Sequence, residues 1–365
     1  MNEICRWKYL KTLSKNNYGN SILNKQSFDI NVQLYFTLFL NMNKILFILL
    51  FLSVSSKTVG QTYKDYEKAI ENAEKVESLS LVFKDDGSDC IDNRILKLKN
   101  LKELSIRFET NREIPEVILK LPSLQYVYLH LGDRSNFPVR IFRIQQLKLL
   151  DITSDKLTSI PPGIGQLHQL ERLSIHSSKL EALPNDLNKL NSLKYLSISS
   201  RYNLVFPDTL DGLCKLEEFN WGEASRFPKE IFEIHSLKKL SFGSPYFQSL
   251  PSGFKNLTNL EELSISGGTL HFFPDDICNL KSLRILDLHS TKFETIPLCV
   301  SEMPSLLSIN LQFNTQFNDF NSLIEILKKT NSIDWVHIDG TQYNEEILNT
   351  MKKESVKIDV IHLYE

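Results

Sequence analysis

Serine, histidine and aspartate recur close together in the middle of the chain, and these residue types could form a nucleophilic catalytic site. Ser174 and His176 are two residues apart, and Asp151 precedes Ser174 by 23 residues. A serine hydrolase needs a histidine beside the serine, an aspartate that orients the histidine, and donors for an oxyanion, usually with a glycine-flanked turn. No such turn surrounds these residues, and a trio of this kind arises easily among many serines. The sequence therefore predicts no catalytic residues, and a hydrolase stays a minor alternative.

Metal and cofactor motifs are equally weak. His130 and His176 lie two repeat units apart, about 10 Å if they are on parallel strands, which is too far for one zinc ion. Gly163-Ile164-Gly165 resembles part of a dinucleotide loop but stands at an ordinary turn after a proline. The acidic segment 85–89 lacks the spacing and final glutamate of a calcium loop. We therefore expect no metal and no cofactor.

An apolar residue followed by proline returns at a nearly fixed interval through most of the chain. The gaps between successive prolines are 23, 23, 23, 23, 21, 23, 23 and 23 residues, and the prolines are Pro115, Pro138, Pro161, Pro184, Pro207, Pro228, Pro251, Pro274 and Pro297. Self-similarity with a period of about 20 to 50 residues indicates a solenoid, in which each unit buries its apolar face against its neighbours. One elongated domain is therefore expected.

Each repeat unit also contains the pattern Leu-x-x-Leu-x-Leu, as in Leu193, Leu196 and Ile198. The last two apolar positions alternate with polar ones, as a strand with one buried face requires. After the proline the apolar spacing becomes three residues, as in Leu187, Leu190 and Leu193, which favours an irregular or 3₁₀ return segment. Each coil is therefore a strand, a turn and a return segment.

This pattern resembles the leucine-rich repeats of about 23 residues that occur in Ras-group repeat proteins and in short exported bacterial proteins. The resemblance covers roughly residues 76–316, and it implies an α/β solenoid of about 12 coils, a horseshoe with a concave parallel β-sheet, and a role in protein binding. The family usually has asparagine three residues after the last strand leucine. Here that column varies and contains asparagine only at Asn314 among the units from Asp155 onward. In the short unit, Trp221 replaces a strand leucine, and we expect its indole to fill the volume of the missing loop residues.

The ends of the solenoid need covers, because a terminal coil would expose its apolar face. A helix over residues 63–75, with Tyr66, Ile70 and Ala73 on one side, is expected to cap the first strand. At the other end, helices over 320–329 and 345–353 alternate with strands at 336–338 and 356–361. The predicted divisions are a leader or upstream segment 1–41, a signal peptide 42–61, an N-terminal helix-strand cap 62–82, repeats 83–316 and an α/β C-terminal cap 317–365.

The segment Ile45 to Leu52 is uninterruptedly apolar, follows Lys44 and precedes small and polar residues. This arrangement is typical of a signal peptide that starts at Met42. The alternative is a membrane anchor over 34–54, which would place Lys44 near its middle at a high energetic cost. A secreted, periplasmic or cell-surface location is therefore expected, with membrane contact only if the segment is not cleaved.

Cysteine spacing and net charge exclude several classes of partner and site. Beyond the leader the cysteines are Cys90, Cys214, Cys278 and Cys299, without a zinc pattern. Cys278 and Cys299 lie on adjacent coils, but their positions counted from Pro274 and Pro297 differ by two residues. A disulfide between them is therefore one alternative, and free buried thiols are the favoured interpretation. The formal net charge of -2 provides no field that would attract nucleic acid.

The outward positions of the predicted strands are the candidate binding surface. Tyrosine and arginine among them are typical of protein contact sites, and small serines leave room for a partner. The expected concave binding face consists of Tyr126, Tyr128, His130, Asp151, Arg172, Ser174, His176, Tyr195, Ser197 and Lys239. We therefore expect a non-catalytic exported scaffold that binds a protein or peptide. The alternative is a carbohydrate or cell-wall binder in which Tyr126, Tyr128 and Tyr195 stack on sugars.

Overall fold

The structure is a computed structural model, and it describes residues 62–84, 91–109, 111, 113–134, 136–200, 204–223, 227–243, 248–330, 332–339, 349 and 357–361. The chain divides into the units Met1–Val59 and Gly60–Glu365, and every described residue belongs to the second. The expected leader, signal peptide and membrane anchor lie outside the described residues. So do the acidic segment 85–89 and all but one residue of the expected helix 345–353.

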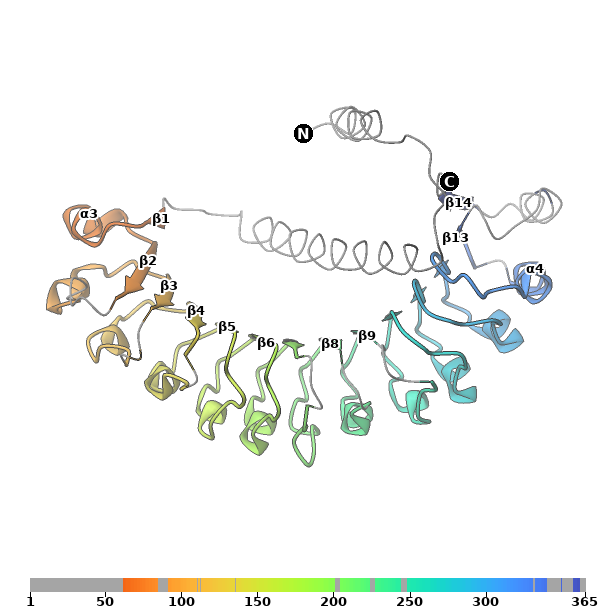
Figure 1. Ribbon diagram of the computed structural model, residues 1–365, viewed down its shortest axis with the longest axis horizontal. Coiled ribbons are helices and arrows are strands. Elements are labelled where there is room, and N and C mark those ends of the chain that lie inside the picture. Colours follow the sequence, from red (N-terminus) through yellow and green to blue (C-terminus); the bar gives the residue numbers. More distant parts are fainter. Residues whose placement is uncertain are drawn as a thin grey trace, which may run out of the picture. The chain divides into compact units, whose positions relative to one another are not determined.

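A single parallel sheet of 14 strands runs through this unit in sequence order, one strand beside the next. Its members are β1 (Thr62–Tyr63), β2 (Ser78–Phe83), β3 (Glu103–Phe108), β4 (Tyr126–Gly132), β5 (Leu149–Ser154), β6 (Arg172–Ser177), β7 (Tyr195–Ser199), β8 (Glu218–Glu223), β9 (Lys239–Gly243), β10 (Glu262–Ser266), β11 (Ile285–Asp287), β12 (Ser308–Asn310), β13 (Trp335–Asp339) and β14 (Lys357–Ile361). Within this unit the strands follow the inner side of an arc (Figure 1). The solenoid predicted from the prolines is confirmed.

Short 3₁₀ helices occupy the return segments on the outer side of the same arc (Figure 1). They are η1 (Ala73–Lys75), η2 (Asn93–Lys97), η3 (Ile118–Lys120), η4 (Val139–Arg143), η5 (Ile164–Gln166), η6 (Asn185–Lys189), η7 (Lys229–Glu233), η8 (Phe254–Asn256), η9 (Asp275–Asn279) and η10 (Leu298–Glu302). The two described α-helices are α3 (Tyr66–Glu71) and α4 (Phe320–Lys329). The predicted 3₁₀ character of the return segments is therefore confirmed.

The repeated leucines form one continuous core between the strands and the 3₁₀ helices. In the coil of β7, Leu193 and Leu196 are 0% exposed and Ile198 is 1% exposed. Each such side chain contributes about 1.5 to 3 kcal/mol by leaving water. Because every coil buries its leucines against the coils on both sides, no coil would be stable alone.

In several coils the recurring proline stands immediately before the 3₁₀ helix. Pro184 stands at the N-cap of η6 with extended backbone, and its carbonyl accepts a hydrogen bond from the Leu187 N–H at 3.0 Å. Pro138, Pro228 and Pro274 have the same place before η4, η7 and η9. Proline has no N–H and a fixed φ, so it costs nothing at the first position of a turn where an N–H would have no partner. The interval between prolines is thus the length of one coil.

The Gly163-Ile164-Gly165 segment serves the contact between coils. Gly163 has φ of 108°, a conformation that favours glycine, and its N–H donates to the Asp186 carboxylate of the next coil at 2.9 Å. Gly253 and Asp276 repeat this arrangement further along. The N–H of each glycine is thus bonded to a carboxylate of the next coil, which fits the turn expected from the sequence.

Buried polar side chains form hydrogen bonds between neighbouring coils near the C-terminal end of the strands. The predicted asparagine position is occupied this way by Asn314, which is 0% exposed and donates to the carbonyls of Leu288 and Leu311 at 2.8 and 2.9 Å. In two other coils a serine one position earlier forms a hydrogen bond to a carbonyl of the preceding coil. Ser177 donates to the Leu157 carbonyl at 2.7 Å, and Ser200 to the Leu180 carbonyl at 2.6 Å. In these two coils the neighbouring serine thus substitutes for the missing asparagine.

Trp221 packs inside an aromatic cluster at the short repeat unit. It is 5% exposed, lies parallel to Phe242 with ring centroids 4.5 Å apart, and contacts Phe219 and Phe227 edge-on or tilted. Its burial agrees with the prediction that the indole fills space inside the short coil.

The caps differ in part from expectation. The N-terminal helix is shorter than predicted, because Asp65 caps α3 at its start through the Lys68 N–H and α3 ends at Glu71. The preceding residues Thr62–Tyr63 form β1, which pairs with β2. At the other end α4 and the strands β13 and β14 lie where the sequence pattern predicts them.

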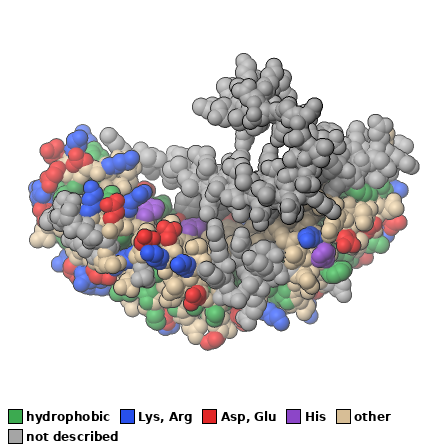
Figure 2. Space-filling model, in the orientation of Figure 1, with side chains coloured by type: hydrophobic (Ala, Val, Ile, Leu, Met, Phe, Trp, Pro, Cys, Tyr) green, Lys and Arg blue, Asp and Glu red, His purple; other side chains and the backbone are tan. Residues whose placement is uncertain are grey.

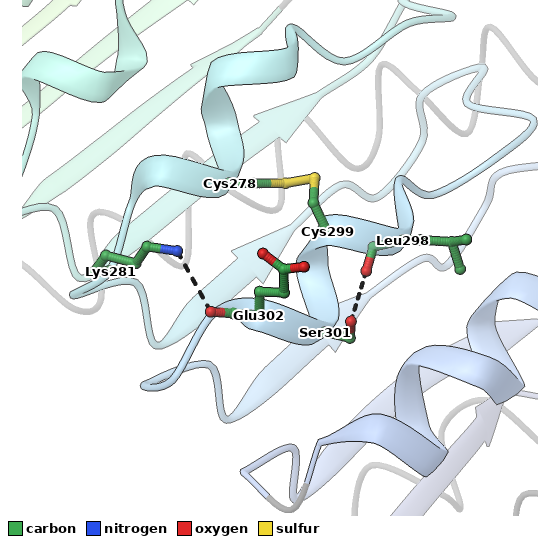
Figure 3. Close-up of a disulfide and its surroundings, with 6 residues drawn as sticks. All are labelled: Cys278, Lys281, Leu298, Cys299, Ser301 and Glu302. Atoms are coloured by element: carbon green, nitrogen blue, oxygen red, sulfur yellow. Dashed lines mark hydrogen bonds between the residues drawn. A yellow bond between two sulfur atoms is a disulfide. The ribbon is translucent and has the colours of Figure 1, made fainter.

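Cys278 and Cys299 form a disulfide between η9 and η10 (Figure 3). The interpretation of this pair as free buried thiols was wrong. The two positions differ in register from the prolines, but Cys278 is near the end of η9 and Cys299 near the start of η10, so their Cα atoms are 5.8 Å apart. That separation is within the range that a disulfide spans. Cys214 is a free, exposed cysteine.

Candidate functional site

The polar side chains of the strands form three rows across the sheet, on the face opposite to the leucines. The strand register aligns Tyr126 with Leu149, Arg172 and Tyr195 in the first row. The second row consists of Tyr128, Asp151, Ser174 and Ser197, and the third of His130, Thr153, His176 and Ser199. The structure therefore brings together the predicted residues of β4, β5, β6 and β7.

These residues differ in how far they are exposed. Tyr126, Tyr128 and His130 are partly exposed, whereas Tyr195, Ser174 and Ser197 are buried. The Arg172 guanidinium lies over the Tyr195 ring at 4.0 Å from its centroid, a cation–π contact. Arg172 and Tyr195 thus form one unit on the face.

Lys239 stands apart from the other predicted residues. It is on β9, two strands beyond β7, and its side chain forms an ion pair with Glu262 of β10 at 2.6 Å. The register places it in the row of Tyr195 and Glu218 but not next to Tyr195.

Burial and neighbouring charges change the proton affinity of three side chains on the face. Burial raises the pKa of Asp151 to about 6, although a hydrogen bond from Ser174 opposes the rise. Burial, with the nearby Arg107 charge, lowers the pKa of His130, so this imidazole is neutral at pH 7. Burial and the charge of Glu103 raise the pKa of Tyr128. The face thus combines a neutral histidine with a carboxyl group that titrates near pH 6.

The order of Asp151, Ser174 and His176 differs from that of a catalytic triad. Asp151 is in register with Ser174 and accepts its hydrogen bond, while His176 is in register with Thr153 and Ser199. A triad requires the aspartate on the histidine and the histidine on the serine. Here the Ser174 hydroxyl donates to the Asp151 carboxylate, whereas in a triad the serine hydroxyl donates to the histidine.

A row of charges with alternating sign borders the sheet just before the strands begin. Its members are Lys148, Glu171, Lys194, Glu217, Lys238, Glu261 and Arg284, and a backbone hydrogen bond joins each to the next. Lys194 and Glu171 pair at 2.9 Å, and Lys238 and Glu217 at 3.3 Å. We call this set the alternating rim. Opposite charges on neighbouring strands support the correct register of the coils.

Sequence reasoning missed an aromatic residue on the same face near the C-terminal end. Trp335 of β13 is 41% exposed, in register with Ser308, which is in register with Ile285, itself 39% exposed. The His337 ring lies nearly parallel to the indole, with centroids 6.1 Å apart. The signal for this position is weak, because Trp335 follows Ser308 by 27 residues, beyond the end of the proline repeat.

The described residues hold neither a metal-binding cluster nor a membrane-spanning helix. They contain no cluster of histidine, cysteine and acidic side chains that could hold a metal ion. Among the helices of this part of the chain, none has the length and apolar character needed to cross a membrane.

Comparison with known proteins points to one family. A family model described as a leucine-rich repeat region matches residues 115–222. No curated protein sequence matches the chain.

Three solved structures align with the chain at low sequence identity. An internalin from Listeria monocytogenes aligns at 16% identity over 83% of this chain and 77% of its own length, with a TM-score of 0.52. A chain of the Drosophila Toll–Spätzle complex aligns at 16% identity over 83% of this chain and 47% of its own, with a TM-score of 0.56. A leucine-rich repeat protein from Leptospira interrogans aligns at 20% identity over 82% of this chain and 100% of its own, with a TM-score of 0.48. The repeat pattern, the stacked parallel strands and the family-model match at residues 115–222 identify this unit as a leucine-rich repeat solenoid.

Proposed function

We propose that the chain is a non-catalytic scaffold that binds a protein or peptide through the concave face of β4, β5, β6 and β7. The observation that carries this proposal is the register of Tyr126, Tyr128, His130 and Arg172 on one face of a sheet whose opposite face is the core. Tyrosine and arginine are the residue types that contribute most to protein interfaces. A preformed sheet also lowers the entropy cost of association, because little of it must be ordered on binding.

We further propose that the protein works in an oxidising compartment outside the cytoplasm. The support is the disulfide between Cys278 and Cys299, since disulfides persist in exported proteins and are rare in reducing compartments. The signal-like segment that starts at Met42 agrees with this proposal.

The test is affinity capture of a partner from envelope extract, followed by binding measurements with the purified partner. Tyr128→Ala and Arg172→Ala should each weaken binding by about 30-fold, as expected for residues that contribute about 2 kcal/mol at an interface. The matched control is Arg143→Ala, which removes an exposed arginine paired with Glu116 on the outer side. Equal binding by all three variants would refute the concave-face proposal.

Carbohydrate binding is the second candidate, and the exposed Trp335 with its parallel neighbour His337 is the observation that favours it. Aromatic rings of this kind present an apolar face beside a polar edge. Binding on a glycan array that is lost in Trp335→Ala or Tyr128→Ala would support this candidate.

A further inference from the structure

A pocket lies where strands β3, β4 and β5 end, beside the row that contains His130. Its volume is about 670 Å³. Its lining includes Arg107, His130 and Thr153 from the strands, and Glu109, Asp133 and Asp155 from the segments that follow them. Figure 2 shows acidic, basic and histidine side chains gathered over the N-terminal coils. The pocket thus adjoins the proposed contact face and differs from it in its density of charge.

Two structural features build this pocket. The register between β4 and β5 shifts between His130 and Gly132, where Gly132 has φ of 54°. Such an irregularity bends the strand end and redirects the residues that follow it. Arg134 then braces the wall, with a side chain only 2% exposed that pairs with Glu113 at 3.0 Å and lies over the Phe108 ring at 5.0 Å.

The charges of the lining are separated into two rows. Arg107, His130 and Thr153 are in register on adjacent strands, and each can donate a hydrogen bond. Glu109, Asp133 and Asp155 follow two or three residues later, which is roughly 7 to 10 Å along the strand direction. Asp133 has a partner in Lys156 at 3.6 Å, and the charge of Arg134 is balanced by Glu113. Arg107 on one side, and Glu109 and Asp155 on the other, remain to face a ligand.

A purely anionic ligand would meet the carboxylates, and a purely cationic one would meet Arg107. An extended peptide places alternate side chains on one face about 6.6 Å apart, which is close to the separation of the two rows. Arg107 would then receive a carboxylate in a charge-assisted hydrogen bond, and Asp155 or Glu109 a basic group.

We propose that this pocket binds an extended segment of a protein partner that carries an acidic and a basic side chain two residues apart. This inference rests on the proposed function, because it names the partner chemistry at one end of the concave face.

The test uses the full chain and four dye-labelled, end-capped pentapeptides in fluorescence polarisation. Their sequences are Ser-Glu-Ser-Lys-Ser, Ser-Gln-Ser-Lys-Ser, Ser-Glu-Ser-Gln-Ser and Ser-Gln-Ser-Gln-Ser, and the doubly charged peptide is also made in the reverse order. The doubly charged peptide, in one of its two orders, should bind about tenfold more tightly than either singly charged peptide, a factor that corresponds to roughly 1.4 kcal/mol.

Two variants test which pocket residue recognises each charged side chain of the peptide. Arg107→Gln should abolish the preference for glutamate over glutamine in the peptide, and Asp155→Asn should reduce the preference for lysine. Arg143→Gln, which changes an arginine on the outer side, should leave both preferences intact. Absence of saturable binding up to millimolar peptide, equal binding of charged and uncharged peptides, or a glutamate preference that survives Arg107→Gln would each overturn the proposal.

The same variants separate this inference from the proposed function. A captured partner that is released by Tyr128→Ala but retained by Arg107→Gln and Asp155→Asn would refute the pocket and leave the concave face standing. A partner that is indifferent to Tyr128→Ala and Arg172→Ala would refute the proposed function itself.

Discussion

Reduction of the Cys278–Cys299 disulfide should destabilise the C-terminal coils by about 3 kcal/mol. The bond closes a loop with a sequence separation of 21 residues. The chain-entropy relation for a loop of that size gives about 11 cal/mol/K, or about 3 kcal/mol at 25 °C, that the bridge removes from the unfolded ensemble. Because coils of a solenoid are stabilised by their neighbours, the loss should appear first as unfolding of the coils that contain η9 and η10.

Urea unfolding followed by circular dichroism, with and without a reducing agent, measures this difference. The double variant Cys278→Ser, Cys299→Ser should have the stability of the reduced protein and should no longer respond to the reducing agent. Cys214→Ser is the control, since this exposed thiol is free and its loss should leave the response unchanged. The reasoning fails if the oxidised protein and the double variant unfold at the same urea concentration.

Three further predictions concern the core, the inter-coil bonding and pH. Leu196→Ala should cost about 2 to 5 kcal/mol of unfolding free energy, because the buried side chain is lost and leaves a cavity. Ser197→Ala beside it should cost under about 1 kcal/mol. Similar losses for the two variants in urea unfolding would contradict the assignment of Leu196 to the core face of β7. Asn314→Ala should cost about 2 to 6 kcal/mol of unfolding free energy, because the Thr291 N–H and the Leu311 carbonyl lose their buried partner at roughly 1 to 3 kcal/mol each. A thermal unfolding temperature equal to that of the unmodified chain would exclude this role. Asp151 has a pKa near 6 in the folded state against 3.8 as its ordinary value, so the folded state binds the proton more tightly and stability falls as pH rises from about 4 to 6. Asp151→Asn should therefore be more stable than the unmodified chain at pH 8, by on the order of 1 to 3 kcal/mol, and this gain should vanish below pH 4. A gain at pH 4 that disappears at pH 8 would show that folding lowers the pKa of Asp151 instead of raising it.

The repeated part of the fold was predictable because the same physical demand recurs in every coil. A strand with one buried face needs leucine at fixed positions, and a turn without spare N–H groups accepts proline, so Leu196 and Pro184 could be assigned from spacing alone. Helix α4 was predictable for a similar reason, since its apolar residues follow helical spacing. The candidate face on β4 to β7 follows directly from this register.

The departures arise where contacts cross between coils or where the interval changes. Counting from the prolines gave Cys278 and Cys299 different registers, but two adjacent 3₁₀ helices allow a diagonal contact that a linear alignment does not show. Ser177 replaces the expected asparagine from one position earlier, and its hydroxyl donates to a different carbonyl of the preceding coil, that of Leu157. Trp335 could not be assigned to the face from the sequence, because the longer C-terminal coil interrupts the 23-residue repeat from which the other face residues were assigned.

The alternating rim has a consequence for how this solenoid can change its length. Lys194 lies between Glu171 and Glu217, so excision of that one coil would set two carboxylates side by side on adjacent strands. Like charges directly opposite each other on neighbouring strands are destabilising. Excision of two consecutive coils would instead bring Glu171 next to Lys238 and preserve the alternation. Shorter or longer versions of this protein should therefore differ by even numbers of coils within this stretch.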